Sequence, residues 1–295
     1  MTRPAVDVVV PFRGTPAELD ALRTRLARLE LQEGDSLLVV DNTPGHEPNT
    51  GEGAVPVLHA AEVSTPGFAR NRGAERSSAG WLVFVDADVV PSPGLLPRYF
   101  DPPPAERTAL LAGVVVDEAV PADGPATARF AYLRATMGQE DMLRDWGFPK
   151  TANAACRRAA FEAVGGFRED IRAAEDADLT YRLRAAGWEV ERRETATGVH
   201  LSRRTLRGFV VQKLLWGAGA AWLARTYPGT FPARRRAGLV WWGARTAAKG
   251  LLSAARSRDR DEAILALLDP LEHLAYEFGR SLPNERPWNP LARLS

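Results

Sequence analysis

The chain has 295 residues, of which 45% are hydrophobic, and its formal net charge is +1. This length is sufficient for one large α/β domain or two smaller domains with a substantial buried core. The near balance of charge argues against the broad electrostatic attraction by which proteins bind nucleic acid, so we expect no nucleic-acid partner. The single cysteine, Cys156, excludes an intrachain disulfide and a thiolate metal cluster.

The beginning of the chain, MTRPAVDVVVPF, has too short an apolar run for a signal peptide. No window of about twenty uninterrupted apolar residues predicts a membrane-spanning helix. Together with the lone cysteine, these features favour a reducing compartment. We therefore expect a cytoplasmic protein that is either free or peripheral at the inner face of the membrane.

The first part of the chain predicts strands that alternate with helices. A β-branched run at residues 6–11 precedes an amphipathic helix at 15–30, and a second strand at 36–41 precedes a Pro/Gly/Asn-rich loop that extends to residue 53. The further predicted elements are a strand at 55–59, a helix at 66–79 and strands at 81–85 and 110–116. This order is typical of a parallel, doubly wound α/β sheet, whose ligands lie beyond the carboxyl ends of the strands.

Beyond residue 119 the predicted elements become less regular. We expect helices at 126–144 and 176–186, and a shorter helix that is capped by Gly165 and Gly166. From residue 205 onward the sequence is mostly helical. It includes the amphipathic segments LVWWGARTAAKGLLSAA and DEAILALLDPLEHLAYEF, the second of which we expect Pro270 to break.

Two aspartates, Asp86 and Asp88, interrupt the apolar sequence WLVFVDADVVP. In an extended chain, residues at i and i+2 project to the same side, so the two carboxylates would converge. Such convergence is unfavourable unless one acid is protonated or a cation lies between them, and oxygen ligands suit Mg²⁺ or Mn²⁺. The alternative is an ordinary polar end to a buried strand.

A second acidic cluster, Glu175, Asp176 and Asp178, lies at the start of a predicted helix. Acids are favoured there because the helix N-terminus offers free N–H groups, so helix capping is the alternative explanation for each of them. A cap requires only one acid, however, and three repel one another. We expect a carboxylate in this position to stay ionised at neutral pH and to serve as a general base for a hydroxyl.

Several separate motifs occur in an order that resembles the family 2 glycosyltransferases with the GT-A fold. They are VVVP and VVDN near the start, GFARNRGAERSSAGWLVFVDADVVP, ANAACRRAAFEAVGGFRED and AEDADLTYRLRAAGW. The resemblance covers roughly residues 6–220. It implies a mostly parallel α/β sheet, a GT-A domain at 1–204 with a nucleotide-binding half at 1–118 and an acceptor half at 119–204, and a helical C-terminal region at 205–295.

The resemblance places the nucleotide sugar beside Pro11, Asp41, Arg70 and Asn71. Asp41 would contact the base or ribose, and Arg70 and Asn71 would lie in a helix start near the nucleotide. Where the family often has an aromatic residue after the first strand, this chain has Arg13, whose guanidinium could stack on the base or bind phosphate.

The resemblance also implies the residues for metal binding and catalysis. Asp88 would ligate the metal, and Asp86 would face the ribose and the metal's coordination shell. Asp176 would be the base, with Glu175 beside it for the acceptor. His200 is a candidate third ligand, because a late histidine completes the metal or diphosphate site in many GT-A enzymes; a structural role is the alternative.

Three further features have both a functional and a structural interpretation. Asn153 could line the sugar or acceptor side, or it could stabilise a turn. The aromatic loop 146–148 could pack on a sugar face or belong to the core. Arg203 and Arg204 could contact phosphate or form a solvated basic turn.

The reaction that the resemblance implies is an inverting transfer from a nucleoside-diphosphate sugar, assisted by Mn²⁺ or Mg²⁺. The acceptor would be a small molecule, a lipid-linked molecule or a glycan. Processive synthases carry Gln-x-x-Arg-Trp where this chain has QKLLW, so we expect a single transfer. The C-terminal helices could lie on a membrane, on the catalytic domain or on a second copy of the chain.

Two alternatives remain at this stage. A haloacid-dehalogenase-type phosphatase also ends a strand with Asp-x-Asp and binds Mg²⁺, but its first aspartate follows the earliest strand and not the fourth. A non-catalytic GT-A-fold partner protein would tolerate the loss of Asp176.

Overall fold

The structure, a computed structural model, describes residues 3–45, 55–138, 143, 146–232 and 238–285. Most of the loop predicted before residue 53 and the basic run Arg234 to Arg236 lie outside the described residues. The chain divides into two compact units. Unit 1 comprises Met1–Val116, Gly138–Asp170 and Glu175–His200, and unit 2 comprises Asp117–Met137, Ile171–Ala174 and Leu201–Ser295.

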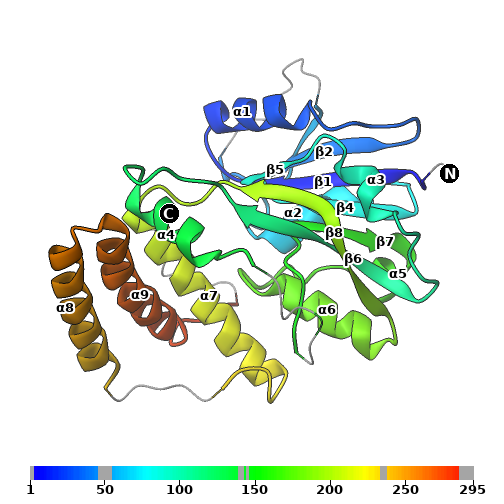
Figure 1. The fold of residues 1–295 in the computed structure, drawn as a ribbon. Helices are drawn as coiled ribbons and strands as arrows, with labels where there is room; N and C mark the ends of the chain where they lie inside the picture. Colours follow the sequence, from blue (N-terminus) through cyan, green and yellow to red (C-terminus); the bar gives the residue numbers. More distant parts are fainter. Residues whose placement is uncertain (1–2, 46–54, 139–142, 144–145, 233–237, 286–295) are drawn as a thin grey trace. The chain divides into compact units, whose positions relative to one another are not determined.

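The centre of unit 1 is an eight-stranded sheet with the strand order β3-β2-β1-β4-β7-β6-β8-β5 (Figure 1). Its strands are β1 (Val6–Phe12), β2 (Ser36–Asp41), β3 (Val57–His59), β4 (Trp81–Val85), β5 (Val89–Pro91), β6 (Thr108–Asp117), β7 (Asn153–Arg157) and β8 (Glu189–His200). Strands β3, β2, β1 and β4 pair in parallel, as the alternating strands and helices predict. The α/β fold class is therefore confirmed.

The sheet is mixed and not wholly parallel. Strand β7 runs antiparallel to both β4 and β6, and β5 runs antiparallel to β8. The register of β4 with β7 pairs Val85 with Asn153, so β7 begins beside the end of β4. This pairing joins sequence segments far apart in the chain, and alternation of apolar residues does not reveal its direction.

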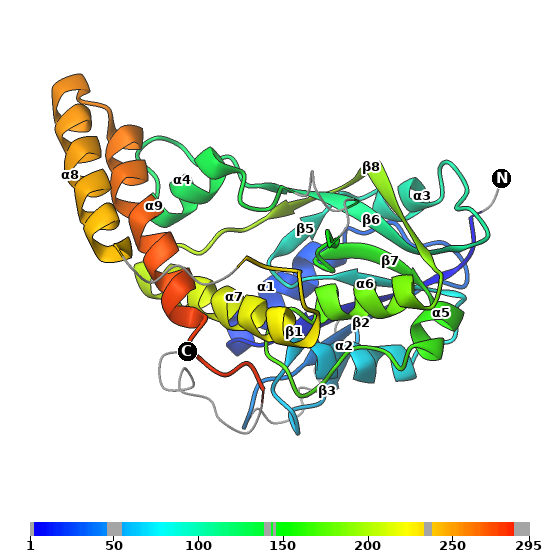
Figure 2. The ribbon, with the colours of Figure 1, turned by 90° about the horizontal axis from the view of Figure 1, so that it is seen from below.

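Three helices cover one face of this sheet: α2 (Pro66–Glu75), α5 (Arg158–Ala163) and α6 (Glu175–Ala185). Figure 2 shows these helices on one side of the strands. Their residues Phe68, Phe161 and Leu179 form one buried cluster with strand residues such as Val9 and Phe84. The side chains of Phe84, Phe161 and Phe167 meet with ring centroids 5.1 to 5.7 Å apart. This core fixes the starts of α2 and α6, both of which carry predicted site residues.

The remaining helices of unit 1 are α1 (Pro16–Leu26) and α3 (Leu95–Tyr99). Helix α1 begins at a capping box in which Thr15 and Glu18 satisfy each other's backbone N–H groups. It ends at Leu26 and not at residue 30, because Ala27 is already the C-terminal cap.

Unit 2 contains α4 (Ala126–Arg134), α7 (Leu206–Thr226), α8 (Leu239–Ser257) and α9 (Arg260–Gly279). Phe130, Phe209, Ile264 and Leu268 form one of its apolar clusters. Helices α7 and α9 can approach closely because residue 217 is a glycine. A Cβ at this position would lie only 2.0 Å from the carbonyl oxygen of Tyr276. The helical character predicted from residue 205 onward is present in α7, α8 and α9.

Two helix predictions are wrong. The helix predicted at 126–144 ends at Arg134, where Ala135 adopts a left-handed conformation and the Asp117 carboxylate accepts hydrogen bonds from Thr136 and Met137; residues 139–142 and 144 lie outside the described ones. Helix α9 continues through Pro270, which is buried within it. Packing against neighbouring helices offsets the hydrogen bond that proline removes.

None of the helices in the described ranges combines the length and apolarity that a bilayer crossing requires. Cys156 is buried in β7, and burial raises the pKa of its thiol to about 12.

Candidate active site

The Asp86-Ala87-Asp88 segment forms a tight turn between β4 and β5. The N–H of Val89 donates to the carbonyl oxygen of Asp86 at 2.9 Å, and the N–H of Asp86 donates to the carbonyl oxygen of Ala152 at 3.1 Å. The extended geometry expected for the two acids is therefore wrong. The turn nevertheless keeps the acids close enough for the charge of Asp88 to act on Asp86.

One buried guanidinium joins the two acidic clusters. Arg70, at 3% side-chain exposure, donates from Nη2 to Asp86 Oδ1 at 2.6 Å and from Nη1 to Glu175 Oε1 at 2.7 Å. Its guanidinium carbon also lies 5.3 Å from the centroid of the Phe167 ring. The two acidic clusters therefore lie on either side of a single side chain.

The electrostatics of this group follow from its burial. Burial by itself would lower the pKa of Arg70, but the charges of Asp86 and Glu175 outweigh this and raise it above its ordinary value. Burial raises the pKa of Asp86; Arg70 opposes the rise, and the charges of Asp88 and Glu175 add to it. An excess of negative charge therefore surrounds one cation, which is an environment suited to an additional positive ion.

Asp176 lies in the first turn of α6, where its Oδ1 accepts a hydrogen bond from the N–H of Ala177 at 2.8 Å. Burial and the charge of Glu175 raise the pKa of Asp176 to about 7, although the Ala177 N–H and Arg70 favour its ionised form. The prediction that Asp176 is fully ionised at neutral pH is therefore wrong. A base whose pKa lies near the working pH is well suited to accept a proton from an acceptor hydroxyl.

The third acid of this cluster, Asp178, has a structural partner. Arg182, one helical turn further along α6, forms an ion pair with the Asp178 carboxylate at 2.7 Å. Arg182 also donates to the carbonyl oxygens of Val164 and Gly166, in the loop after α5. Asp178 thus stabilises the packing of α6, whereas Asp176 accepts the Ala177 N–H and carries the raised pKa.

Asp88 lies across from the end of β8. Val89 pairs with His200 in the sheet, and His200 Nε2 is 3.7 Å from Asp88 Oδ2. His200 is 4% exposed, while the Asp88 side chain is 28% exposed. Within the described residues, no group of three or more His, Cys, Asp or Glu side chains is arranged to hold a metal ion by itself.

The donor set nevertheless fits a divalent cation that also takes oxygens from its substrate. A carboxylate and an imidazole nitrogen suit Mn²⁺, and Mg²⁺ is bound in many nucleotide sites by one or two carboxylates together with substrate phosphates. Asp88 and His200 supply such a pair, and Asp86 is already paired with Arg70.

The predicted nucleotide side lies at the ends of β1 and β2. Asp41 is buried, and its carboxylate accepts from the N–H of Thr43 at 3.0 Å and lies 3.7 Å from His59 Nδ1. Pro11 is half-buried within β1, and Arg13 is exposed just beyond that strand. These positions agree with the general rule that ligands lie beyond the carboxyl ends of parallel strands.

The amides of Asn71 and Asn153 are occupied within the protein. Asn71 bonds to the backbone of Phe167 and to the carboxylate of Glu169. Asn153 is completely buried and accepts from the Tyr99 hydroxyl at 2.6 Å, while its Nδ2 donates to the carbonyl oxygens of Val114 and Ala196. In this structure both asparagines hold parts of unit 1 together, and their contact with the nucleotide sugar stays a prediction.

The aromatic loop 146–148 lies against α6. The Trp146 and Tyr181 rings meet edge-on at 5.2 Å, and the Tyr181 hydroxyl donates to the carbonyl oxygen of Trp146. Trp146 remains 43% exposed. Arg203 and Arg204 belong to unit 2, where Arg204 forms an ion pair with Glu118 at 2.9 Å.

Two residues near the site were missed in the sequence. Arg25 of α1 donates to the carbonyl oxygen of Ala87 at 3.0 Å and so holds the turn between Asp86 and Asp88. His59, at the end of β3, lies beside Asp41. The only signal for His59 was its position at a predicted strand end, which is the signal that drew attention to His200.

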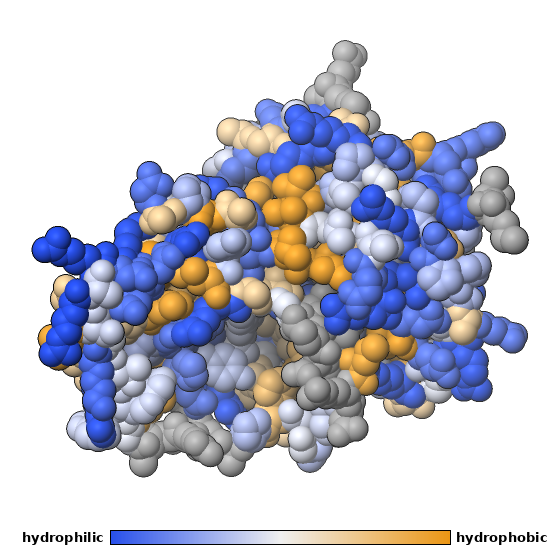
Figure 3. All heavy atoms as spheres, in the orientation of Figure 1, coloured by the Kyte–Doolittle hydropathy of each residue, from blue (hydrophilic) through white to orange (hydrophobic). Residues whose placement is uncertain are grey.

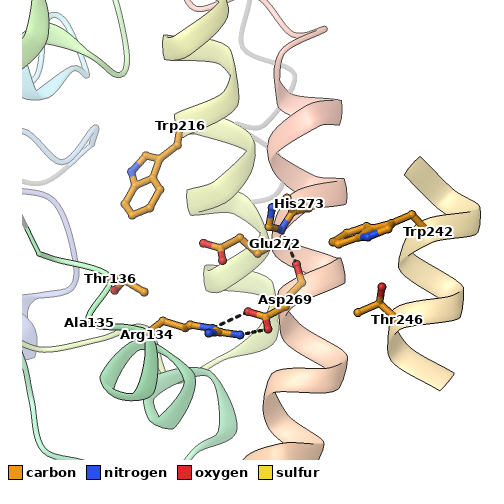
Figure 4. A pocket seen from close by; sticks show the side chains of 9 residues that line it. All are labelled: Arg134, Ala135, Thr136, Trp216, Trp242, Thr246, Asp269, Glu272 and His273. Carbon is orange, nitrogen blue, oxygen red and sulfur yellow. Dashed lines mark hydrogen bonds and ion pairs between the residues drawn. The ribbon is translucent and has the colours of Figure 1, made fainter. Parts of the chain in front are cut away.

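A separate hollow of about 510 Å³ lies within unit 2, between residues of α4, α7, α8 and α9 (Figure 4). Its lining includes Trp216, Trp242 and the ion pair of Arg134 with Asp269. Buried Lys213 lies 4.0 Å from the Trp216 ring centroid and 2.5 Å from Glu272. The QKLLW segment therefore contributes to the helical unit, and its charges are matched there.

Comparison with known proteins identifies the family. The family model described as "Glycosyltransferase like family 2" matches residues 47–219, a range that contains Arg70, both aspartates of the Asp86–Asp88 turn, Asp176 and His200. The chain belongs to this family. Membership of this family argues against the phosphatase alternative. The position of Asp86, after β4 and not after the first strand, agrees with this conclusion.

The curated relatives are two pre-mycofactocin glycosyltransferases of Mycobacterium tuberculosis, from the strains CDC 1551 / Oshkosh and ATCC 25618 / H37Rv. Each is 31% identical over 238 residues, which is 76% of this chain and 48% of the relative. The chain thus spans about half the length of these relatives.

Among solved structures, the chain is similar to a mannosyltransferase of Pyrobaculum calidifontis determined in complex with GDP-Man and Mn²⁺. The TM-score is 0.60 at 16% identity, over 95% of this chain and 86% of that one. This likeness establishes the GT-A-like fold.

Proposed function

We propose that the chain is a glycosyltransferase that moves a sugar from a nucleoside-diphosphate sugar to a hydroxyl, or another nucleophile, of an acceptor. The observation that carries this proposal is the match to family 2 across both acidic clusters, which Arg70 joins into one site. The nucleotide-sugar complex of the Pyrobaculum calidifontis mannosyltransferase supports a donor of this class. The acceptor would be a small molecule, a lipid-linked molecule or a glycan.

We propose that Asp88 and His200 hold Mn²⁺ or Mg²⁺, with Asp86 facing the same region from its ion pair with Arg70. When bound, the cation would neutralise the charge that develops on the leaving diphosphate. The Mn²⁺ in the mannosyltransferase structure is consistent with this assignment. Asp41, at the end of β2, would contact the base or ribose.

The proposed chemistry is a single inverting displacement. The acceptor oxygen forms a bond to the anomeric carbon while the bond from that carbon to the diphosphate oxygen breaks, and the nucleoside diphosphate leaves with the electron pair. Asp176 receives the proton of the acceptor hydroxyl on the side opposite to the leaving group. Transfer would be non-processive, because QKLLW lacks the arginine of the processive motif.

A thermal-shift panel of nucleoside diphosphates, each with and without Mn²⁺, tests the donor class. We expect at least one nucleotide to raise the melting temperature in a metal-dependent manner, since a ligand that binds only the folded state stabilises it. The absence of any metal-dependent shift across the panel would contradict the transferase assignment.

Asp88→Asn should abolish the metal-dependent part of this shift and weaken nucleotide binding in the presence of Mn²⁺ by roughly 10- to 100-fold, the size of effect known for groups that tune metal sites. Isothermal titration with Mn²⁺ and with the stabilising nucleotide measures both effects. Glu106→Gln, which alters an exposed acid just before β6, is the control. Unchanged metal dependence in Asp88→Asn would move the ligand role to another residue.

The rate of transfer should rise with pH through a midpoint near the pKa of Asp176, which is about 7 in the free protein. The rate rises and does not fall with pH because a general base acts only after it has lost its proton. A raised pKa shifts this loss to higher pH. The measurement is kcat/KM from pH 5 to 9, with stability checked at each pH. A flat profile through neutral pH would contradict the assignment of Asp176 as the base.

A further inference from the structure

Helix α8 is exposed along one side. Its other side packs on α9, where Gly243 and Ala254 are buried and a Cβ on Gly250 would lie 2.5 Å from Ala266. The small residues on this buried side allow the two helices to approach closely, as in other tightly packed helix pairs. The exposed side therefore has no covering element within the described part of unit 2.

That exposed side carries large apolar residues. Val240 is 73% exposed, Trp241 65%, Leu252 53% and Leu251 38%. Val240 and Leu251, and likewise Trp241 and Leu252, are about three helical turns apart and so lie on the same side of the helix. The exposed alanines at 244, 248 and 255 continue this surface between them. Together they form an apolar stripe, which consists of residues 240, 241, 244, 248, 251, 252 and 255.

A basic stripe borders the apolar one. Arg245, Lys249 and Arg256 are exposed and lie at spacings of four and seven residues, which place them side by side along the helix. The guanidinium of Arg245 lies 5.1 Å from the Trp241 ring centroid, so the two stripes touch. Helix α8 contains no aspartate or glutamate. Figure 3 shows hydrophilic side chains over the region of α8, at the left of the view.

We propose that α8 binds the surface of a membrane that contains anionic lipids. Apolar residues that include tryptophan, bordered by arginine and lysine, are typical of helices that lie in the interface of a bilayer. The apolar stripe would enter the boundary between headgroups and acyl chains, while the basic side chains extend to the lipid phosphates. Lys249 and the two arginines provide the charge complementarity that selects an anionic surface over a neutral one.

Charge also argues against a second copy of the chain as the occupant of this face. In a two-fold symmetric contact the same surface meets itself, so the basic stripes of the two copies would lie in or beside one interface. No acidic residue of α8 is available to offset their repulsion. An anionic membrane, in contrast, pairs with every cation of the stripe.

Vesicle flotation tests the proposal with the full chain. Vesicles of phosphatidylcholine alone are compared with vesicles of phosphatidylcholine mixed with phosphatidylglycerol. We expect binding to the mixed vesicles that weakens with added salt, and little binding to the neutral ones. The double variant Arg245→Glu/Lys249→Glu should lower partitioning to the mixed vesicles by roughly tenfold or more. Trp241→Ser/Leu252→Ser, which removes apolar area from exposed positions, should lower it comparably.

Matched controls alter exposed residues of unit 1 and should leave vesicle binding unchanged: Arg28→Glu for charge and Leu31→Ser, at 46% exposure, for apolar area. Three results would overturn the proposal. The first is no binding to mixed vesicles, and the second is equal binding to both kinds of vesicle. The third is that the wild type binds no vesicles but forms a dimer in light scattering, and that this dimer dissociates in the Trp241→Ser/Leu252→Ser variant. Flotation needs neither donor nor metal, so its outcome is independent of the proposed transferase activity.

Discussion

Replacing Asp176 by asparagine is expected to lower kcat by about a thousandfold, within the range of 10²- to 10⁴-fold that general bases contribute, while donor binding is retained. The asparagine amide keeps the size of the carboxyl group and can accept the Ala177 N–H bond, so the start of α6 should be preserved. Transfer is measured with a radiolabelled donor, and donor binding by calorimetry.

Asp178→Asn is the matched control on the same helix turn. It should lose stability, because it weakens the ion pair with Arg182, yet it should retain turnover. If both acids only capped the helix, the two variants would behave alike. Retained turnover in Asp176→Asn would favour a different base or the alternative of a non-catalytic GT-A-fold partner.

The stability of the Asp176→Asn variant should also depend on pH. Between the ordinary aspartate pKa of about 4 and the folded-state pKa of about 7, the folded protein holds a proton on Asp176 that the unfolded chain has lost. The free energy of unfolding of the wild type should therefore fall as pH rises through this range. At pH 8 Asp176→Asn should be more stable than the wild type by up to about 4 kcal/mol, since the two pKa values differ by about three units of about 1.36 kcal/mol each, and this difference should shrink toward pH 5. Urea denaturation at the two pH values measures it.

Replacing Arg70 by methionine is expected to destabilise unit 1 by about 3 kcal/mol at pH 8 and to abolish transfer. The change leaves the carboxylates of Asp86 and Glu175 without their shared cation, and breaking a buried pair typically costs about 3–5 kcal/mol. We take the lower end of that range because the Asp86 side chain is 32% exposed, so water compensates part of the loss.

This loss should depend on pH. Without Arg70 nothing opposes the rise in the pKa of Asp86 that burial causes, so Asp86 would take a proton more readily and the penalty should decrease toward pH 5. Arg72→Met removes two partly exposed ion pairs, with Glu75 and Glu169, and should cost only about 1 kcal/mol, well below the loss in Arg70→Met. A pH-independent loss in Arg70→Met would indicate that packing on Phe167, and not charge, is the main contribution.

Arg70 has contacts that the resemblance did not predict. The resemblance implies a position near the nucleotide, and in the structure two of the guanidinium nitrogens donate to Asp86 and Glu175. We infer that Arg70 is a positioning residue for both acidic clusters. An Arg70→Lys variant, which keeps the charge but not the fork of two donors, should recover part of the stability and little of the activity.

Much of the fold follows from local sequence patterns. The β-branched runs and the helical leucine spacing predict β1, β2, β4 and α1 because each has a regular apolar period. The antiparallel direction of β7 and the continuation of α9 through Pro270 were not predicted, since pairing direction and helix packing depend on contacts between distant segments.

The sequence alone determined which residue types are available: the acids of two clusters, a histidine at a strand end and an arginine within a predicted helix. Only the tertiary structure decided that one guanidinium joins Asp86 to Glu175, and that the Asn153 amide forms its hydrogen bonds inside the sheet. It also decided that Asp176 has a pKa near 7, because burial and neighbouring charge depend on side chains that the chain brings together from α2, β4 and α6. Local patterns predict elements, whereas the chemistry of a site depends on distances between them.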